Sequence, residues 1–230
     1  MRPRKEARPG LGNAEARKEV AMLWDALGLK GHAIRGRDGP FGTVSDLLFD
    51  DRTWRLRWLV GDTSYWMPHR LVLLPVRSMR SVDPGRRRVS VALTMAQIDA
   101  SADIGLDPPV WLQTEVAARS RAPCDSHLRS VEAVVGHRVH TPDGVIGHVD
   151  DLLVSDGDWS IRFFRIDTWN WHPGQYILIP PRVLREIDWP SRSIHLDVDH
   201  RQIENSPPCA IGSPAEDDDP SRGIRLLRRQ

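Results

Sequence analysis

The chain has 230 residues, of which 40% are hydrophobic and 27% charged, as is typical of a soluble globular protein. Its formal net charge is +1, which argues against a protein that coats nucleic acid, and no apolar run is long enough to cross a bilayer. Only Cys124 and Cys209 are present, so a disulfide framework and a four-cysteine zinc site are excluded, and we expect a cytoplasmic protein.

The first folded unit is expected to follow a polar N-terminal extension. Residues 1–21 show no apolar periodicity and are predicted to be disordered. From residue 31 onward, short apolar runs such as Val44–Phe49 alternate with turn residues, a pattern typical of a small β-barrel or β-sandwich. Asp38-Gly39 is a hairpin-turn dipeptide, and Thr94–Gln97 matches a capping box that opens a short helix.

The same pattern then occurs a second time. At an offset of 105 residues, residues 31–99 align without a gap with residues 136–204, and 24 of the 69 aligned pairs are identical. Such similarity over an ungapped alignment is not expected by chance, so we infer an internal duplication. In the second copy Asp143-Gly144 is the turn dipeptide, and Asp199–Gln202 is the counterpart of the capping box.

The remaining segments connect or follow the two copies. Gln113–Arg121 is predicted to form two helical turns within the connection, after an extended Asp107-Pro-Pro-Val stretch. The C-terminal residues combine prolines, an acidic run and a basic end, which predicts disorder. The expected organisation is an extension over 1–21, unit one over 22–100, a linker over 101–135, unit two over 136–208 and a disordered tail over 209–230.

The repeated pattern resembles the PRC-barrel family, which includes the cytoplasmic domain of the photosynthetic reaction centre H subunit and a domain of a ribosome maturation factor. The resemblance rests on the openings GHAIRGRDGPFGTVSDLLFD and GHRVHTPDGVIGHVDDLLVS, on the strands ending at Pro75 and Pro180, and on the closing TMAQIDAS and DHRQIENSP. Met22-Leu23-Trp24 and residues 167–174 are similar to bacterial tandem PRC-barrel proteins. The fold that this resemblance implies is all-β, with two tandem small β-barrels, each followed by a short helix, packed as a pseudo-symmetric pair.

The function that the resemblance implies is a non-enzymatic scaffold or adaptor that binds another protein. It implies no cofactor, no metal, no specific nucleic acid and at most peripheral membrane contact. Two rivals are an H-subunit-like role in photosynthetic electron transport, disfavoured by the missing transmembrane helix, and a ribosome-assembly adaptor, disfavoured by the missing RNA-interacting domain. A metal-dependent hydrolase is the least favoured alternative, because the sequence lacks HExxH, GxSxG and P-loop motifs.

Two equivalent loops are the candidate protein-interaction elements. Residues 64–69 read SYWMPH and residues 169–174 read WNWHPG, and tryptophan clustered beside proline is suited to anchoring a partner. The alternative is that these rings cap the end of each barrel or pack between the units. The candidate contact residues are Trp66, Pro68, Trp169, Trp171 and Pro173.

Other repeated residues are expected to support the fold. Gly42 and Gly147 suit a bulge or a close backbone approach, and Asp62 and Asp167 are placed to satisfy backbone groups where a strand ends. Paired carboxylates can also perform acid–base chemistry, but these recur together with turn glycines, as structural residues would. The full set is Gly39, Gly42, Asp46, Asp62, Pro75, Gly144, Gly147, Asp151, Asp167 and Pro180.

The two copies carry opposite charge. Residues 31–99 contain 11 Arg and 7 Asp, whereas residues 136–204 contain 7 Arg against 11 Asp and Glu. Opposite charges on one shared plan predict that the units face each other within a chain or pair between chains as a homodimer, with drift on solvated surfaces as the alternative. Trp54 and Trp159 are expected to be half-buried, and Trp111 and Trp189 to pack where the units meet.

Overall fold

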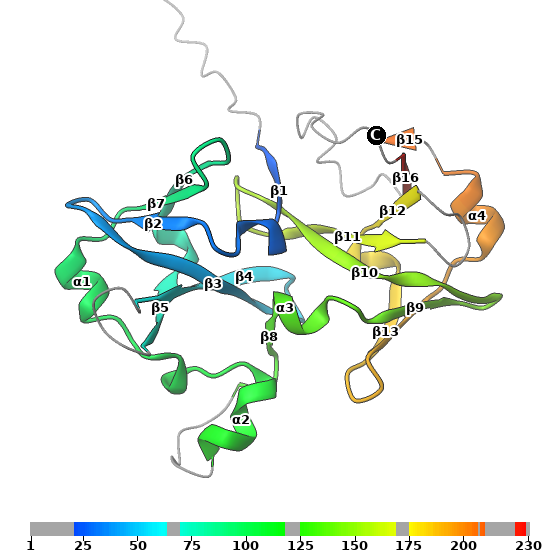
Figure 1. Cartoon of the computed structure of the whole chain (residues 1–230). Helices are drawn as coiled ribbons and strands as arrows, with labels where there is room; N and C mark the ends of the chain where they lie inside the picture. The colour runs from blue at the N-terminus through cyan, green and yellow to red at the C-terminus, as the bar shows by residue number, and fades with distance from the viewer. Residues whose placement is uncertain are drawn as a thin grey trace, which may run out of the picture.

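The computed structural model describes residues 21–63, 70–117, 125–168, 175–206, 208–209 and 224–228. The described chain is mostly strand, arranged in two β-sheets with a few short helices (Figure 1). The predicted all-β class is confirmed at this level. Within these ranges the hydrogen-bonded strand order of neither sheet closes into a ring, so the predicted tandem barrels are not confirmed.

The two sheets share one topology. The first has the order β5-β4-β3-β2-β7-β6 and the second has the order β12-β11-β10-β9-β14-β13, which is the same order displaced by one repeat. This correspondence is what an internal duplication predicts. The strands of the first sheet are β2 (Ala33–Arg35), β3 (Pro40–Asp50), β4 (Arg55–Asp62), β5 (Leu71–Pro75), β6 (Met79–Asp83) and β7 (Arg88–Val91). Those of the second are β9 (Arg138–Thr141), β10 (Gly144–Ser155), β11 (Ile161–Asp167), β12 (Gln175–Ile179), β13 (Leu184–Asp188) and β14 (Ser193–Leu196).

The two units exchange a strand. β1 (Leu23–Asp25) precedes unit one but pairs with β10 of unit two, and β8 (Leu128–Ser130) precedes unit two but pairs with β3 of unit one. The two pairings are equivalent, because β1 and β8 are themselves 105 residues apart, as are the β10 and β3 residues that they pair with. β8 lies inside the range 101–135 that was predicted only to connect the units.

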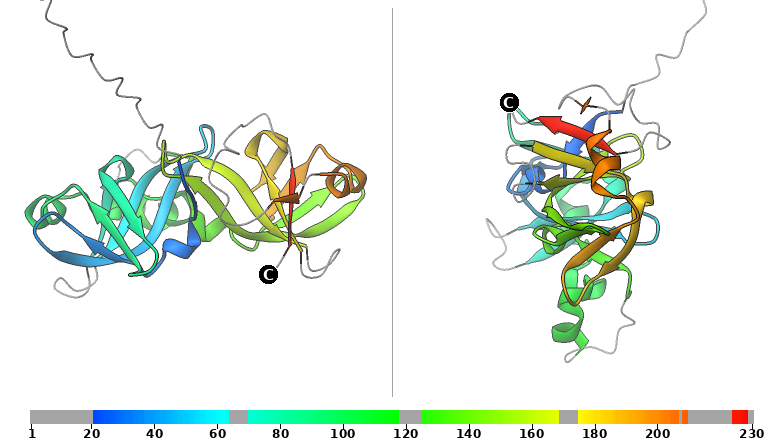
Figure 2. Two further views of the ribbon diagram at one scale, coloured as in Figure 1. Left: turned by 90° about the horizontal axis from the view of Figure 1, so that it is seen from above. Right: turned by 90° about the vertical axis from the view of Figure 1, so that its right-hand side faces the viewer.

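A further contact obeys the same symmetry at the junction of the units. The amide of Leu56 donates to the carbonyl of Trp159 at 2.8 Å, and the amide of Ile161 donates to the carbonyl of Trp54 at 2.7 Å. Each unit therefore presents the same surface to the other, as in an isologous dimer. The two halves lie side by side along the long axis of the molecule (Figure 2).

One apolar core runs through both units. The Phe49 and Trp54 rings are stacked 5.9 Å apart, and Trp54 meets Phe164 of the other unit edge-on at 5.4 Å. Most buried residues of both sheets belong to one contact cluster, and Leu48, Val60, Leu73 and Leu128 form a second, smaller one on unit one. Trp54 and Trp159 are half-buried, as expected, and both have a positive φ, 57° and 56°, at the turn that ends β3 or β10. Because burial of each aromatic ring stabilises by about 2 kcal/mol, the shared core ties the units to one another.

The close backbone approach expected at two glycines is confirmed. A Cβ atom on Gly42 would lie 2.1 Å from the carbonyl oxygen of Asp62, and one on Gly147 would lie 1.9 Å from that of Asp167. Gly147 also has φ +157° and follows a register shift in the β9–β10 pairing. Any side chain there would force the two strands apart.

The two capping boxes are also confirmed. In α1 (Met95–Asp99), Thr94 accepts from the Gln97 amide and Gln97 accepts in return from the Thr94 amide. Asp199 and Gln202 make the same reciprocal pair ahead of α4 (His200–Glu204). The other short helices are η1 (Leu27–Leu29), η2 (Val76–Ser78), η3 (Ile104–Leu106), α2 (Val110–Ala117), α3 (Val131–Val134) and η4 (Pro181–Val183).

The helix in the connection begins earlier than predicted. α2 starts at Val110, directly after Pro108 and Pro109, because proline is well suited to the residue that precedes or opens a helix. Asp107, just before it, accepts hydrogen bonds from Trp58 Nε1 at 2.6 Å and from the guanidinium of Arg57 at 3.1 Å. These bonds fix the start of α2 against unit one.

The C-terminal stretch differs from the expectation of a disordered tail. β16 (Arg225–Arg228) pairs antiparallel with β12, and β15 (Pro208–Cys209) pairs with β16. Ile224, just before β16, is buried in the core. β12 would otherwise leave a row of unpaired backbone groups, and β16 supplies their partners. No helix in the described ranges has both the length and the apolar character needed to traverse a bilayer.

Candidate functional site

The tryptophan loops singled out from the sequence lie outside the described residues. Trp66, Pro68, Trp169, Trp171 and Pro173 therefore remain predictions. The bases of both loops are described and are alike. Thr63 Oγ1 donates to the carbonyl of Arg70 at 3.0 Å, and Thr168 Oγ1 donates to the carbonyl of Gln175 at 2.9 Å. Both loops thus leave and rejoin their units at equivalent points.

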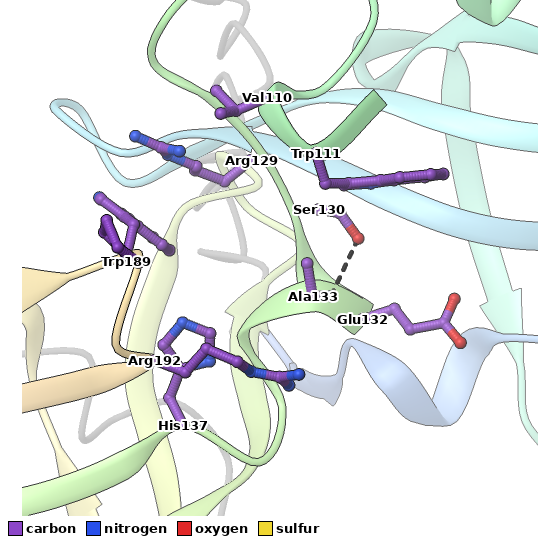
Figure 3. A pocket seen from close by; sticks show the side chains of 10 residues that line it. Val110, Trp111, Arg129, Ser130, Glu132, Ala133, His137, Trp189 and Arg192 are labelled. Carbon is purple, nitrogen blue, oxygen red and sulfur yellow. Dashed lines mark hydrogen bonds between the residues drawn. The ribbon is translucent and has the colours of Figure 1, made fainter. Parts of the chain in front are cut away.

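A groove of about 540 Å³ opens where the connection between the units passes unit two (Figure 3). Helix α2 forms one side, β8 and α3 form the floor, and the turn between β13 and β14 forms the other side. This volume lies in the range of small-molecule and peptide side-chain sites. The lining residues are Val110, Trp111, Arg129, Ser130, Glu132, Ala133, His137, Trp189, Pro190 and Arg192.

Trp189 is a fixed wall of this groove. The Arg129 guanidinium carbon lies 4.0 Å from the Trp189 ring centroid, a cation–π contact. Arg129 Nε also donates to Asp51 Oδ2 at 2.7 Å, and His127 Nδ1 lies 2.7 Å from Asp51 Oδ1. The side chains of Arg129 and Asp51 are only 14% and 9% exposed. The guanidinium is thus held between a carboxylate and an indole, and its charge is neutralised.

Trp111 also lines the groove and is the more exposed ring, with its indole directed away from Trp189 (Figure 3). It lies on α2 and is 57% exposed, which is unusual for so large an apolar side chain. Trp189 packs at the contact between the units, as expected, but Trp111 does not. A largely exposed indole at a groove is typical of a surface that binds a partner.

His137 lies buried beneath the groove. It is 3% exposed, meets Trp189 edge-on at 5.8 Å, and neither ring nitrogen has a hydrogen-bond partner in the described part of the chain. Burial, and secondarily the Arg192 guanidinium, lower its pKa, so the ring is neutral at pH 7. Its counterpart His32 also has an unpartnered Nδ1 and a pKa lowered by burial. The buried histidine is therefore common to both units, whereas the groove above it is not built from common residues.

Arg192 is the uncompensated charge at the groove. Its side chain is exposed, and it donates to the carbonyl of Val135 at 3.1 Å. It has no carboxylate partner among the described residues. Glu132, the acidic lining residue, is paired with Lys30 at 2.6 Å. The groove thus combines two indoles with one cation that lacks a counter-charge.

Asp46 and Asp151 serve the strand exchange. Asp46 lies on β3 and accepts a hydrogen bond from Ser130 Oγ at 2.5 Å, and Ser130 belongs to β8, which pairs with β3. Asp151 lies on β10 and accepts a hydrogen bond from the Leu27 amide at 2.8 Å, and Leu27 follows β1, which pairs with β10. Desolvation raises the pKa of each carboxyl to about 6. Both groups are occupied with donors of the exchanged segments, which is a structural role.

The groove was not predicted as a site. Its residues come from three separate parts of the sequence, and the signal that was available is divergence between the copies. Trp189 stands where unit one has Pro84, and Arg129 stands where Trp24 precedes unit one. Within the described ranges, no three His, Cys, Asp or Glu side chains are grouped so that they could hold a metal ion.

The comparisons with known proteins assign no family. No family model matches the chain, and no curated protein matches it. Function is therefore inferred from the residues and contacts described above.

Proposed function

We propose that the chain is a non-enzymatic adaptor of PRC-barrel type, acting in the cytoplasm, and that it binds another protein through the groove between Trp111 and Trp189. The observation that carries this proposal is the 57% exposure of Trp111 at a groove that a second, fixed indole, Trp189, also lines. The shared strand order of the two sheets and the repeated capping helices support two units that each form a small barrel.

The architecture suits a rigid binding module. Strand exchange and a common core hold the two units in one arrangement, so a partner that contacts both does not have to order them first. Preorganisation of this kind lowers the entropic cost of association. Tryptophan in a partly desolvated groove is among the side chains that contribute most to binding.

The test compares two variants of the full chain by affinity capture from the cells that produce it. Trp111→Ala removes the exposed ring of the groove, whereas Leu106→Ala removes an apolar side chain that is 67% exposed and does not line the groove. A stoichiometric partner captured by the natural chain and by Leu106→Ala, but lost with Trp111→Ala, is the expected result. Capture that is insensitive to Trp111→Ala would show that the partner binds elsewhere.

A further inference from the structure

We propose that the edge of β12 is a second protein-binding site, which accepts an extended basic–aliphatic segment as an added strand, and that β16 closes this site within the chain. The inference goes beyond the proposed function, because the site does not involve the groove. β16 lies beside β12, whereas α2 projects from the opposite side of the molecule (Figure 1 and Figure 2). In this arrangement β16 is an autoinhibitory strand.

The strand order of unit two differs from that of unit one by one inserted strand. In unit one the segment that follows α1 pairs directly with β5, where Val72 and Asp103 form an antiparallel bridge. The counterparts of these two residues, 105 positions later, are Ile177 on β12 and Pro208 on β15. Instead of pairing with each other, both pair with Leu226 of β16. The same edge thus closes directly in unit one and admits an extra strand in unit two.

The edge of β12 provides what an added strand needs. The pairing with β16 is antiparallel and covers four positions, from Gln175 opposite Arg228 to Leu178 opposite Arg225. Main-chain hydrogen bonds of this kind give affinity for an extended segment, and the pockets for its side chains give selectivity. Ile224, just before β16, is only 6% exposed and belongs to the main core cluster. The site therefore selects a segment with an aliphatic side chain at this position.

The preference for a basic segment follows from the charges of the two parts. Residues 136–204 of unit two contain 7 Arg against 11 Asp and Glu, whereas residues 222–230 contain four Arg and no acidic residue. Opposite charges on two surfaces favour their encounter and disfavour partners of the wrong sign. A segment of another protein that takes the place of β16 is therefore expected to be basic.

β16 is suited to being displaced. It is four residues long, and in the described ranges only the two-residue β15 pairs with its other side. Short elements at a sheet edge open at a small fraction of the free energy of global unfolding. A strand of the same chain competes at an effective concentration on the order of 1 mM. A segment that binds the open edge with a Kd on the order of 10 µM is therefore weakened about 100-fold while β16 is in place.

The experiment measures binding of a fluorescein-labelled peptide, Gly-Ile-Arg-Leu-Leu-Arg-Arg, to the full chain by anisotropy. Two variants release β16: Ile224→Asp puts a carboxylate at a buried position, and Leu226→Pro puts a proline inside a paired strand. Gln230→Asp adds the same charge outside β16 and is the control. We expect both releasing variants to bind the peptide about 100-fold more tightly than the natural chain and the control do.

Three results would overturn the proposal. Equal binding by the natural chain, the control and both releasing variants would place the peptide elsewhere. No binding by either releasing variant, with its circular dichroism and urea transition retained, would show that β15 closes directly on β12, as the equivalent segment does on β5. A natural chain that dimerises, with the dimer lost in Leu226→Pro, would show exchange of β16 between copies instead of closure within one chain.

Amide signals of the 15N-labelled Leu226→Pro chain locate the bound peptide. Binding should shift the signal of Ile177 on β12 and leave that of Val72, its counterpart on β5, unchanged; the opposite pattern would contradict a site at β12. A peptide with Glu in place of each Arg is expected to bind about tenfold more weakly, and equal binding would refute the basic preference. Trp111→Ala should leave peptide binding unchanged, so this site and partner capture through the groove can fail independently.

Discussion

Two buried carboxylates are expected to make the fold more stable as the pH falls through 6. Asp46 and Asp151 hold the exchanged segments through Ser130 and Leu27, and desolvation raises the pKa of each to about 6. A carboxyl whose pKa is higher in the folded chain than in the unfolded one binds its proton more tightly when folded. Its stabilising contribution is complete below the unfolded value of 3.8 and is lost as the pH rises through 6.

The magnitude follows from the size of the shift. A rise from 3.8 to about 6, at 1.36 kcal/mol for each unit, corresponds to about 3 kcal/mol for each carboxyl. Other groups titrate in the same range with the opposite sign. Burial lowers the pKa of His32, His137 and His140, so their contribution to stability is lost as the pH falls below 6.5. The effect must therefore be isolated as a difference between variants.

Asp151→Asn provides that difference, because asparagine resembles the protonated carboxyl and does not titrate. The free energy of unfolding is measured with urea at pH 4.5, 6.0 and 7.5 for the natural chain and for the variant. We expect the stability of the variant relative to the natural chain to be about 2 kcal/mol more favourable at pH 7.5 than at pH 4.5, because the carboxyl of the unfolded chain is still mostly ionised at pH 4.5. Any cost of placing an amide beside Arg165 is independent of pH and cancels in this comparison.

Asp46→Asn tests the same reasoning at the equivalent position. The expected dependence has the same sign, because Asp46 is desolvated in the same way at the other exchange point. Carboxyl carbon chemical shifts of the natural chain should show two titrations with midpoints near 6. Midpoints below 4 for both groups, or a stability difference that does not change with pH, would refute the account of desolvation at the exchanged strands.

Three further measurements, two on variants and one on the natural chain, test the fold and the groove. Gly147→Ala places a Cβ 1.9 Å from the Asp167 carbonyl oxygen and is expected to lower the free energy of unfolding in urea by about 3 kcal/mol. The control Gly85→Ala, whose Cβ would have its nearest neighbour at 3.6 Å, should cost less than about 1 kcal/mol. Similar losses in the two variants would refute the role of the close approach. Asp51→Asn leaves the nearly buried Arg129 without its carboxylate and is expected to cost about 3 kcal/mol, and an unchanged urea midpoint would contradict this. Because the core is continuous, calorimetry should show one cooperative transition for both units, and two separate transitions would contradict the shared core.

The parts of the fold that sequence could predict are those encoded by neighbouring residues. The turn at Asp38-Gly39, the turn at Asp143 with Gly144 opening β10, and the two capping boxes act over two to four positions, so the local sequence specifies them. The duplication was also visible, because the copies retain enough identity to align without a gap.

The strand exchange could not be predicted in this way. β1 and β8 are only three residues long, and the segments Leu23–Asp25 and Leu128–Ser130 share just their leading leucine. Their partners lie more than 75 residues away in the sequence for β8 and more than 125 residues away for β1. Neither periodicity nor turn chemistry carries information on pairing at such separations, which tertiary packing decides. The groove was missed for the same reason, since it exists only once β8 and α3 are placed beside unit two.

The two copies differ in the residues that line the groove. Residues that support the fold are kept in both units, as Gly42 and Gly147 show at the close approach. The residues of the groove are not kept. Trp189 is replaced by Pro84 in unit one, and Trp24, which occupies the place of Arg129, donates its indole N–H to Asp156 at 3.0 Å.

Under the proposed function, a symmetric framework with asymmetric groove residues predicts one partner for each chain. Duplication supplies two equivalent positions at which such a groove could form. Helix α2, on the connection between the units, covers the position beside unit two. A binding surface that occurred twice would require the indole and the guanidinium stack at both positions, and unit one lacks the Trp189 counterpart. Since binding energy concentrates in a few aromatic and arginine side chains, the proposed function predicts a stoichiometry of one partner for each chain.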